Sequence, residues 1–436
     1  MPDEFIELIR NQYDNAEDAL ILADTCFRDV PGWDSIVGLG LITAFADKYG
    51  VAVSADQIRG AHTIADLYEL VSQNNKRTGH GTFVTRPLVD ATYNDAKQVV
   101  LSRFNKDAVS VLDMTMANPL RANDPEIGDV IYWKGCPVCF RAANRRKLYF
   151  RGRPLLGSVR GLTCIKRDAP AEALVVLREV QANRSRGCSI AYSNSQCLET
   201  DRMARASHAT PGPRSCTRFL WRPIRPFACL AYFFRRKVLK LPMPCWRAYS
   251  TLEDADIQVE YKGFVVRRFL DFDPNFFDVL MEEYLKCNVG LVSSRSAEEL
   301  RWVYGSRVKS GRVVVLGAIR RSQPCGFVVL KTDQFARRWM LMDWFAIRND
   351  EMILGMLLDV SIRFLKERTP AIMLETYGFE QRVQHLLQSR LWLRRPYGCN
   401  AVSYNFFDQK LENEFKVGVG ADDWFWGPWD GDVCMC

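Results

Sequence analysis

The first 75 residues carry apolar side chains at helical spacing. Hydrophobic residues recur every three or four positions over Glu4–Gln12 and Ser35–Tyr49, which predicts two amphipathic helices. Thr63, with Asp66 three residues further on, has the pattern of a helix N-cap. After Asn75 the chain becomes polar and contains glycine, as is typical of a linker. An all-α first domain is therefore expected.

Beyond about residue 97, short apolar runs alternate with amphipathic stretches. The first block is expected to hold strands near 130–133, 159–165 and 189–192 and a helix at 169–182. The second is expected to hold strands near 264–268, 313–319, 326–330, 340–346 and 371–375 and a helix at 350–367. Both blocks place a long helix between two central strands, which favours an internal duplication of an α/β mixed-sheet domain. The predicted organisation is a first domain at 1–76, a linker at 77–96, a mixed domain at 97–225, a linker at 226–256 and a second mixed domain at 257–436.

Charge is distributed unevenly between these parts. Residues 1–75 carry 13 acidic and 4 basic side chains, whereas the remainder carries 38 acidic and 55 basic ones, within a net charge of +8. Opposite charges suggest that the two surfaces meet, or that both meet charged partners. Two domains of different isoelectric point would show the same asymmetry.

The composition favours a globular, cytoplasmic protein. Hydrophobic residues make up 48% and charged residues 25% of the chain, so extensive disorder is not expected. No apolar run is long enough to span a bilayer, and the longest candidate, Pro226–Phe234, stops at Arg235. The acidic N-terminus lacks the features of a secretory signal. Fourteen cysteines scattered through a long chain fit a reducing compartment.

One cysteine pair has the spacing of a metal or redox motif. Cys136 and Cys139 form a CPVC sequence, but a structural zinc site needs a second such pair or a histidine pair. The chain has only four histidines, which are far apart in sequence: residues 62, 80, 208 and 385. No metal site is therefore predicted.

The most specific motif, Asp34-Ser35-Ile36, opens the second predicted helix. Asp34 can cap this helix, which places the Ser35 hydroxyl beside free backbone N–H groups and the positive end of the helix dipole. A phosphodiester is favoured at such a position. Together with Phe27 and Thr63–Leu67, the motif resembles acyl carrier domains, whose motif reads Asp-Ser-Leu. The resemblance implies a four-helix carrier fold with 4'-phosphopantetheine on Ser35, attached by a phosphopantetheinyl transferase.

Two positions depart from that family. Gly40 and Ala46 stand where many carriers have glutamate. Fewer carboxylates on this helix favour a carrier that serves a tethered partner over one that docks onto many enzymes. The alternative interpretation of Asp34-Ser35 is an ordinary helix cap in an unspecialised helical bundle.

The two mixed blocks resemble GCN5-related N-acyltransferase (GNAT) folds in tandem. In the first block, Gly161–Ile165, the helix from about Ala169 and the sequence SIAYSNSQ follow the family's order of strand, helix and strand. In the second, LMDWFA, ILGMLLDVSIRFLKE and AIMLETYG follow the same order. The resemblance implies that the fourth strand and the next helix hold a pantetheine thioester, such as that of acyl-coenzyme A.

The family's diphosphate-binding turn is degenerate in both blocks. Close approach of backbone to phosphate needs small residues, and the motif contains glycines. The first block offers Lys166, Arg167, Ala169 and Ala171, and the second offers Arg348. Either coenzyme A binding has been lost, or the thioester arrives on the carrier, whose phosphate stays attached to Ser35.

Acyl transfer to an amine needs a proton acceptor for the amine and a proton donor for the thiolate. The candidates near the expected strand ends are Tyr192 and Asn194 in the first block and Glu375 and Tyr377 in the second. Glu375 could act as base, and either tyrosine could protonate the thiolate. The alternative for each is ordinary packing or solvation.

Two further segments allow other functions. Arg141–Arg153 is rich in arginine and contains aromatic residues, so it could follow a nucleic-acid backbone or meet the acidic carrier. Phe227–Lys240 is apolar and then basic, as in interfacial helices, although an interdomain linker is the preferred interpretation.

The expected function is transfer of an acyl group from the Ser35 arm to a small-molecule amine, in a biosynthetic pathway. The expected partners are a phosphopantetheinyl transferase, an acyl-loading enzyme and the amine; neither nucleic acid nor a membrane span is expected. Two alternatives remain. The body could load the carrier from acyl-coenzyme A, or it could be a non-catalytic module that presents the carrier to separate enzymes.

Overall fold

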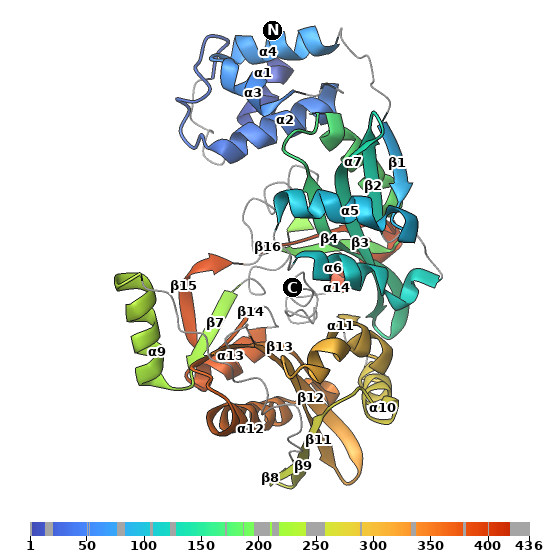
Figure 1. Ribbon diagram of the computed structural model, residues 1–436, viewed down its shortest axis with the longest axis vertical. Helices are drawn as coiled ribbons and strands as arrows, with labels where there is room; N and C mark the ends of the chain where they lie inside the picture. Colours follow the sequence, from blue (N-terminus) through green and yellow to red (C-terminus); the bar gives the residue numbers. More distant parts are fainter. Residues whose placement is uncertain are drawn as a thin grey trace.

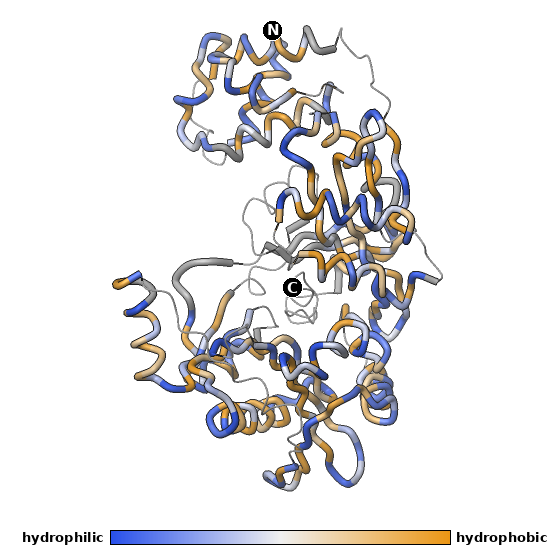
Figure 2. The backbone as a smooth tube through the Cα atoms, in the orientation of Figure 1, coloured by the Kyte–Doolittle hydropathy of each residue, from blue (hydrophilic) through white to orange (hydrophobic). Residues whose placement is uncertain are grey.

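The computed structural model describes residues 2–13, 21–49, 51, 53–75, 83–104, 108–122, 128–170, 172–185, 187–195, 210–211, 218–240, 258–287, 290–332, 337–377, 381–399 and 401–418. Figure 1 shows a helical unit at one end and two α/β parts that follow it along the long axis of the molecule. Figure 2 shows hydrophobic residues concentrated in the strands of both α/β parts. The molecule is thus mixed α/β with an all-α N-terminal unit.

The N-terminal unit is built from four helices within the described residues. They are α1 (Asp3–Arg10), α2 (Ser35–Tyr49), α3 (Ala55–Gly60) and α4 (Ile64–Asn75). Their apolar faces share one core, in which the Phe5 and Phe45 rings stack with centroids 5.4 Å apart. The Tyr13 hydroxyl donates to the carbonyl of Phe27 at 2.6 Å, and burial raises the pKa of that phenol. These four helices thus share a hydrophobic core of their own.

Side-chain caps set the helix starts in this unit. Asp34 accepts the N–H of Val37 at 2.9 Å, so it caps α2 as expected. Thr63 and Asp66 exchange hydrogen bonds of 2.9 and 3.2 Å, which confirms the predicted capping box before α4. The backbone N–H groups of Thr63 and His62, which donate to the Asp66 carboxylate, lower its pKa. Local sequence therefore determines these boundaries.

The first mixed sheet has eight strands among the described residues. They are β1 (Phe83–Pro87), β2 (Gly128–Trp133), β3 (Cys136–Phe150), β4 (Arg153–Ile165), β5 (Ile190–Ser195), β6 (Thr210–Pro211), β10 (Leu291–Ser293) and β16 (Ala401–Phe406). The associated helices are α5 (Asp90–Arg103), α6 (Val109–Met116), a 3-10 turn (Pro119–Ala122), α7 (Glu172–Ser185) and α14 (Gln409–Gly418). β2, β3 and β4 form an antiparallel meander, and β5 returns parallel to β4 after α7.

Strands β2 and β3 are buried on both faces because helices cover each side. Val130, Phe140 and Ala142 pack with α5 and α6, whereas Ile131 and Cys139 pack with α7. The burial removes the alternation of apolar and polar residues that would mark a half-exposed strand.

The second mixed sheet also has eight strands among the described residues. They are β7 (Arg218–Pro223), β8 (Gln258–Tyr261), β9 (Phe264–Phe269), β11 (Val313–Arg320), β12 (Gln323–Thr332), β13 (Arg338–Ala346), β14 (Met373–Tyr377) and β15 (Leu393–Cys399). Its helices are α9 (Pro226–Phe233) with a π-helical turn (Phe234–Val238), α10 (Pro274–Leu285), α11 (Ala297–Lys309), a 3-10 turn (Ile347–Asn349), α12 (Glu351–Arg368) and α13 (Gln381–Ser389). β11, β12 and β13 form a meander, and β14 returns parallel to β13 after α12.

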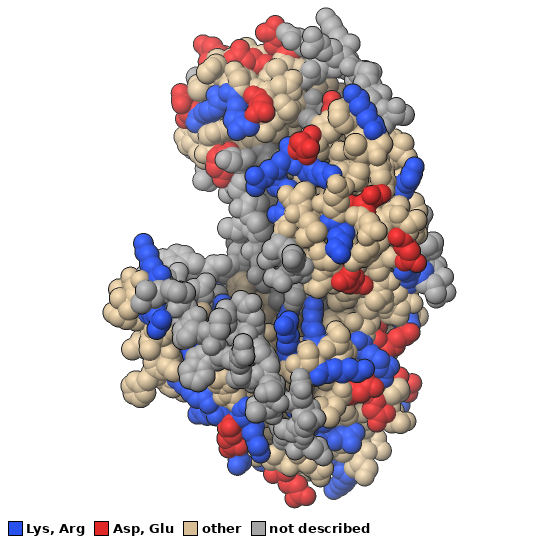
Figure 3. Space-filling view, viewed as in Figure 1, with Lys and Arg blue, Asp and Glu red and all other residues tan. Residues whose placement is uncertain are grey.

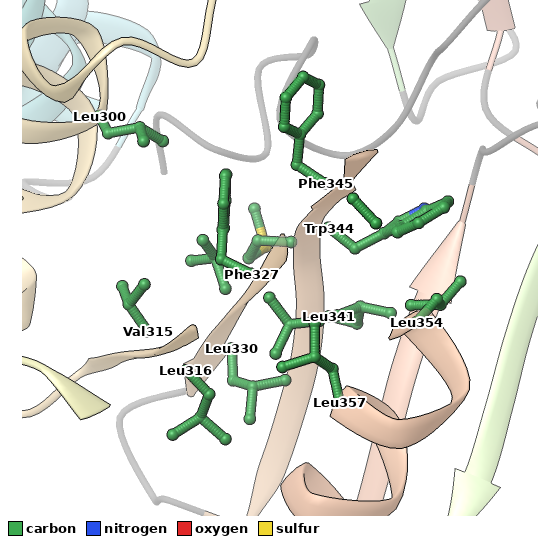
Figure 4. Close-up of a cluster of buried hydrophobic side chains, with 14 of the residues drawn as sticks. Leu300, Val315, Leu316, Phe327, Leu330, Leu341, Trp344, Phe345, Leu354 and Leu357 are labelled. Atoms are coloured by element: carbon green, nitrogen blue, oxygen red, sulfur yellow. The ribbon is translucent and has the colours of Figure 1, made fainter. Parts of the chain in front are cut away.

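The core of the second sheet is layered on both sides. Adjacent residues of β13 point to opposite faces, so Phe345 lies on the side of Phe327 while Trp344 lies on the side of Leu354 in α12 (Figure 4). Tyr284 of α10 contacts the Phe345 ring at a centroid distance of 4.1 Å. The predicted strands and helix of this block are confirmed, with small shifts at their ends.

The two sheets exchange strands. β7 precedes the second block in sequence but pairs antiparallel with β14, and β16 near the C-terminus pairs antiparallel with β5. In the second sheet, the neighbour of the parallel strand β14 thus comes from before this block in sequence. In the first sheet, the neighbour of the parallel strand β5 comes from near the C-terminus. The matching order of meander, helix, parallel strand and exchanged strand supports the expected duplication.

This exchange departs from the expected domain boundaries. The predicted division at residue 225 assigns β7 to the first domain, and the division at 257 assigns β10 and β16 to the second. The expected linker at 77–96 contains β1 and the start of α5, and the expected linker at 226–256 begins with α9. Periodicity along the chain carries no information about which distant strand supplies the hydrogen bonds of an edge.

The basic stretch Arg141–Arg153 is largely buried, which differs from the surface role considered for it. Most of it is strand β3, in which Arg141, Arg145 and Arg146 are buried. Arg141 pairs with the buried Asp129 at 3.0 Å. These three arginines face the protein interior, whereas Lys147, Arg151 and Arg153 of the same stretch are exposed.

Candidate active site at the parting of parallel strands

The parallel strand pairs β4/β5 and β13/β14 separate after a short ladder. β13 and β14 pair only at Arg338↔Met373, Trp339↔Leu374 and Met340↔Glu375. Beyond this point β13 continues to Ala346 paired with β12, and β14 continues to Tyr377 paired with β7. The sheet therefore opens between two of its central strands.

Side chains and a bulge define the start of this opening. The Thr376 hydroxyl donates to the carbonyl of Leu341 at 2.9 Å, which replaces the next ladder bond. A register shift between β12 and β13 leaves Met342 as an extra residue. Such bulges re-aim a strand and are frequent beside active sites. The β13 backbone beyond Leu341 thus presents an inner edge of the sheet on its β14 side.

The two predicted catalytic residues of the second block lie at this point. Glu375 is in the last residue pair of the ladder, is 4% exposed and forms an ion pair with Arg338 at 2.6 Å. Tyr377 lies two residues further on and is fully buried, with its ring 5.0 Å from that of Phe219. Because Arg338 already engages its carboxylate, Glu375 has a structural role in this state, and a role as base stays a prediction.

The first block repeats the arrangement. β4 and β5 pair at Gly157↔Ile190, Ser158↔Ala191 and Val159↔Tyr192 and then separate. Tyr192 therefore occupies the position that Glu375 holds in the second block. It is 1% exposed and belongs to the core that joins the two sheets. Asn194 follows two residues later in β5, and its side chain lies outside the described part.

In the second block, the turn proposed to bind a diphosphate leads into a helix whose N-terminus is already capped. Asp350 caps α12 by accepting the N–H groups of Met352 and Ile353 at 2.8 and 3.4 Å. Its carboxylate thus occupies the donors and places negative charge where a diphosphate would bind. Arg348 is exposed and has a positive φ of 57° in the preceding turn.

In the first block, the corresponding turn is only partly described. Lys166 donates its N–H to the carbonyl of Val138, and Ala169 donates its N–H to that of Lys166. Arg167 is exposed, and Ala171 lies outside the described residues. These contacts form a tight turn and give no sign of a phosphate cradle.

The carrier motif lies in the N-terminal unit, on the helix that faces the body. Ser35 is the first residue of α2, with Asp34 as its cap, while the side chains of Ser35 and Ile36 lie outside the described part. Leu174 of α7 packs against both the core of this unit and the core under the first sheet. An apolar contact therefore connects the N-terminal unit to the body. Figure 3 shows acidic side chains on the outer surface of this unit.

The comparisons with known proteins concern the body. No protein-family model matches the sequence, and no curated protein matches it. The chain is similar to Saccharomyces cerevisiae N-myristoyltransferase with bound myristoyl-CoA, with 11% identity and a TM-score of 0.47 over 75% of this chain and 83% of that one. It is similar to a GCN5-related N-acetyltransferase from Anabaena variabilis, with 10% identity and a TM-score of 0.45 over 75% and 73%. A probable N-acyltransferase from Enterococcus faecalis gives 9% identity and a TM-score of 0.49 over 76% and 74%. Similarity at this level does not assign the chain to a family.

A buried charge cluster, unforeseen from the sequence, joins the two sheets beside the second opening. Arg295 follows β10 of the first sheet and pairs with Asp343 of β13 through two hydrogen bonds of 3.0 and 3.1 Å. Both side chains are fully buried. Arg295 also donates to the carbonyl and hydroxyl of Ser293 at 2.7 and 3.0 Å. The pair is bidentate and hydrogen-bonded, which a buried ion pair needs to offset its desolvation.

Glu299 and Arg146 extend the cluster. Glu299 of α11 accepts the N–H of Lys147 in β3 at 3.2 Å and is 1% exposed. Burial raises its pKa to about 7, against the opposing effects of Arg146, Lys147 and Arg295. Arg146 is fully buried over the Trp302 ring at 5.1 Å. Arg146 and Glu299 are far apart in sequence, and the pairing of β10 with β3 brings the elements that carry them together.

Among the described residues, no group of three or more His, Cys, Asp or Glu is arranged to hold a metal ion. Cys136 is exposed whereas Cys139 is buried, and burial raises the pKa of the Cys139 thiol. In the described part of the chain, no helix combines the length and apolar character needed to cross a bilayer.

Proposed function

We propose that the chain is an acyltransferase that passes an acyl group from a phosphopantetheine arm on Ser35 to a small-molecule amine. The observation that carries the proposal is the parting of β13 and β14: among the described residues their ladder ends at Met340↔Glu375, while β13 continues along β12 to Ala346. Such an inner edge can hydrogen-bond an extended chain of amides, in the manner of an added strand. A pantetheine arm is a chain of that kind.

The carrier as the acyl source is supported by α12. Asp350 occupies the N–H groups at the start of this helix with its own carboxylate, which disfavours the diphosphate of coenzyme A. A phosphate attached to Ser35 would stay at α2 through its covalent bond, so it needs no free N–H groups there, although Asp34 already caps this helix. A carrier-bound donor therefore removes the need for a diphosphate site in the body.

The residues around the second opening suggest how the reaction is supported. The arm, when bound, supplies the thioester. Tyr377 is the last residue of β14 and is the proposed proton donor to a departing thiolate. In the first block the candidate donor is Tyr192, which holds the position that corresponds to Glu375. Arg338 forms an ion pair with Glu375, which lies in the last residue pair of the ladder, so this carboxylate helps to position the strand ends. If the ion pair opens, Glu375 can accept the proton of the amine.

The alternatives make different demands on the same residues. Loading of the carrier from acyl-coenzyme A would require the body to bind coenzyme A. The candidate residues for that binding are Arg348, Lys166, Arg167, Ala169 and Ala171. A non-catalytic docking module would require only the contact between the N-terminal unit and α7. An acyl-loading enzyme and a cytoplasmic setting belong to the main proposal, and small-molecule biosynthesis is its proposed context.

The first test is modification of Ser35. The full chain is incubated with a phosphopantetheinyl transferase and coenzyme A, and its intact mass is measured. We expect a mass gain of one phosphopantetheine group for the wild type and for Ser54→Ala, and none for Ser35→Ala. Ser54 is a matched control because it is another serine at the start of a helix of the same unit, where it caps α3. No gain on the wild type, or an equal gain on Ser35→Ala, would refute the carrier assignment.

The second test separates transferase from docking module. The acyl-loaded full chain is offered a panel of amines, and amide products are measured by mass spectrometry. We expect an amide from at least one amine, with a lower rate in Tyr377→Phe. Ser35→Ala supplied with acyl-coenzyme A tests the alternative donor, because amide formation by that variant at the wild-type rate contradicts dependence on the carrier. Loss of acyl only to water, with every amine, would indicate a docking module.

A further inference from the structure

The helix α9 exposes an apolar face that nothing in the proposed function uses. Phe227 is 90% and Leu230 is 72% exposed, and the stripe continues at helical spacing through Phe234 and Val238, with Leu239 beside it. Figure 2 shows this helix standing clear of the body at one side of the molecule. Contiguous apolar patches of this kind are rare on monomeric proteins and mark interaction surfaces.

The exposed face belongs to a firmly anchored helix. The opposite side of α9 packs through Cys229 and Tyr232 against Ile372 and Met373 at the end of the second sheet. At the base of the helix, Arg225 donates to the carbonyls of Lys366 and Thr369 at 2.6 and 2.9 Å, and also to that of Ala371. The expected interdomain linker is therefore a fixed helix, and its outer stripe points to water because the inner one is already buried.

The sequence on both sides of α9 carries charges of one sign. From Arg202 to Leu252 the chain contains eleven basic and no acidic residues. Within this stretch Arg235 and Lys240 are exposed, at the C-terminal end of the apolar stripe. Basic residues next to exposed phenylalanine and leucine are the composition of helices that lie in the interface of anionic membranes. Attachment to a bilayer by one helix face requires no membrane-spanning segment.

We propose that the outer face of α9, formed by Phe227, Leu230, Phe234, Val238 and Leu239, docks the protein on an anionic lipid surface. The apolar side chains enter the boundary between headgroups and acyl chains, and the exposed Arg235 and Lys240 contact the headgroup phosphates. An anionic bilayer is the occupant that fits, because it offers apolar and negatively charged contacts side by side. The proposal does not depend on acyl transfer.

The test is sedimentation of the full chain with vesicles of phosphatidylcholine alone and of phosphatidylcholine with phosphatidylserine. We expect binding to the anionic vesicles that weakens with added salt, and little binding to the neutral ones. Phe227→Glu with Leu230→Glu should lower the partition coefficient at least about tenfold, because two apolar anchors become charged. Leu101→Glu is the matched control, since Leu101 is an exposed apolar residue on α5, and it should bind as the wild type does.

Three results would overturn the proposal. They are absence of binding to anionic vesicles, equal binding to both vesicle types, and unchanged binding by the double variant. Light scattering after size-exclusion chromatography tests the other occupant, because a dimer that the double variant abolishes, without vesicle binding, would identify the face as a contact between copies. Thermal unfolding shows whether the double variant is folded, and its midpoint should match the wild type because both side chains point to water.

Discussion

The pKa of Glu299 gives the sharpest prediction, because two strong effects oppose each other there. Burial disfavours the carboxylate, whereas Arg146, the N–H of Lys147 and Arg295 favour it. In the structure burial prevails and raises the pKa from 4.5 to about 7. The folded protein then binds the proton more tightly than the unfolded chain does. Stability contributed by this group is present below about pH 4.5 and is lost as the pH rises to about 7.

The magnitude follows from linkage. Each unit of pKa difference corresponds to about 1.4 kcal/mol, so titration of Glu299 lowers the free energy of unfolding by about 2 to 3 kcal/mol between about pH 5 and about pH 8. Glu299→Gln removes this titration. As the pH rises over this range, the free energy of unfolding of the variant minus that of the wild type should therefore increase by about 2 to 3 kcal/mol. A constant cost of placing an amide beside Arg146 cancels in the comparison.

The assay is urea unfolding of the full chain, followed by tryptophan fluorescence at several pH values. Trp302, Trp339 and Trp344 lie in or beside the joined sheets and report their unfolding. Glu298→Gln is the matched control, because Glu298 precedes Glu299 on α11 but is exposed. A flat Glu299→Gln difference, or one that shifts toward the wild type at high pH, would refute the reasoning and mean that the arginines outweigh burial.

Two other variants test the parts of the candidate site. Arg295→Met leaves the buried Asp343 carboxylate without its bidentate partner and should lower the free energy of unfolding by about 3 to 5 kcal/mol, as measured by urea unfolding; a loss below about 1 kcal/mol would mean that water reaches Asp343. Asp350→Asn keeps a capping side chain on α12 but removes its charge, so coenzyme A should bind a few times more tightly by calorimetry at an unchanged unfolding temperature. Unchanged binding would show that the Asp350 charge is not what disfavours a diphosphate there.

Much of the candidate site was predictable from local sequence. The cap at Asp34, the capping box at Thr63 and Asp66, and the strand–helix–strand order around α12 are encoded by neighbouring residues. The degenerate turn at Arg348 was also visible, although only the structure shows that Asp350 occupies the N–H groups of the helix. The positions of Tyr192 and Glu375 in the last pairs of their ladders follow from strand register, which the sequence does not contain.

The positions of the helices and of most strands follow from local sequence, because caps and hydrophobic periodicity act over a few residues. Strand pairing, and with it the exchange of β7 and β16 between the sheets, depends on long-range packing. The tertiary structure also determines that the arginines of β3 are buried and that the outer stripe of α9 is exposed. Burial depends on which distant elements pack together, and neighbouring residues do not encode this. A strand rich in arginine can therefore be buried, and an apolar helix face can be exposed to water.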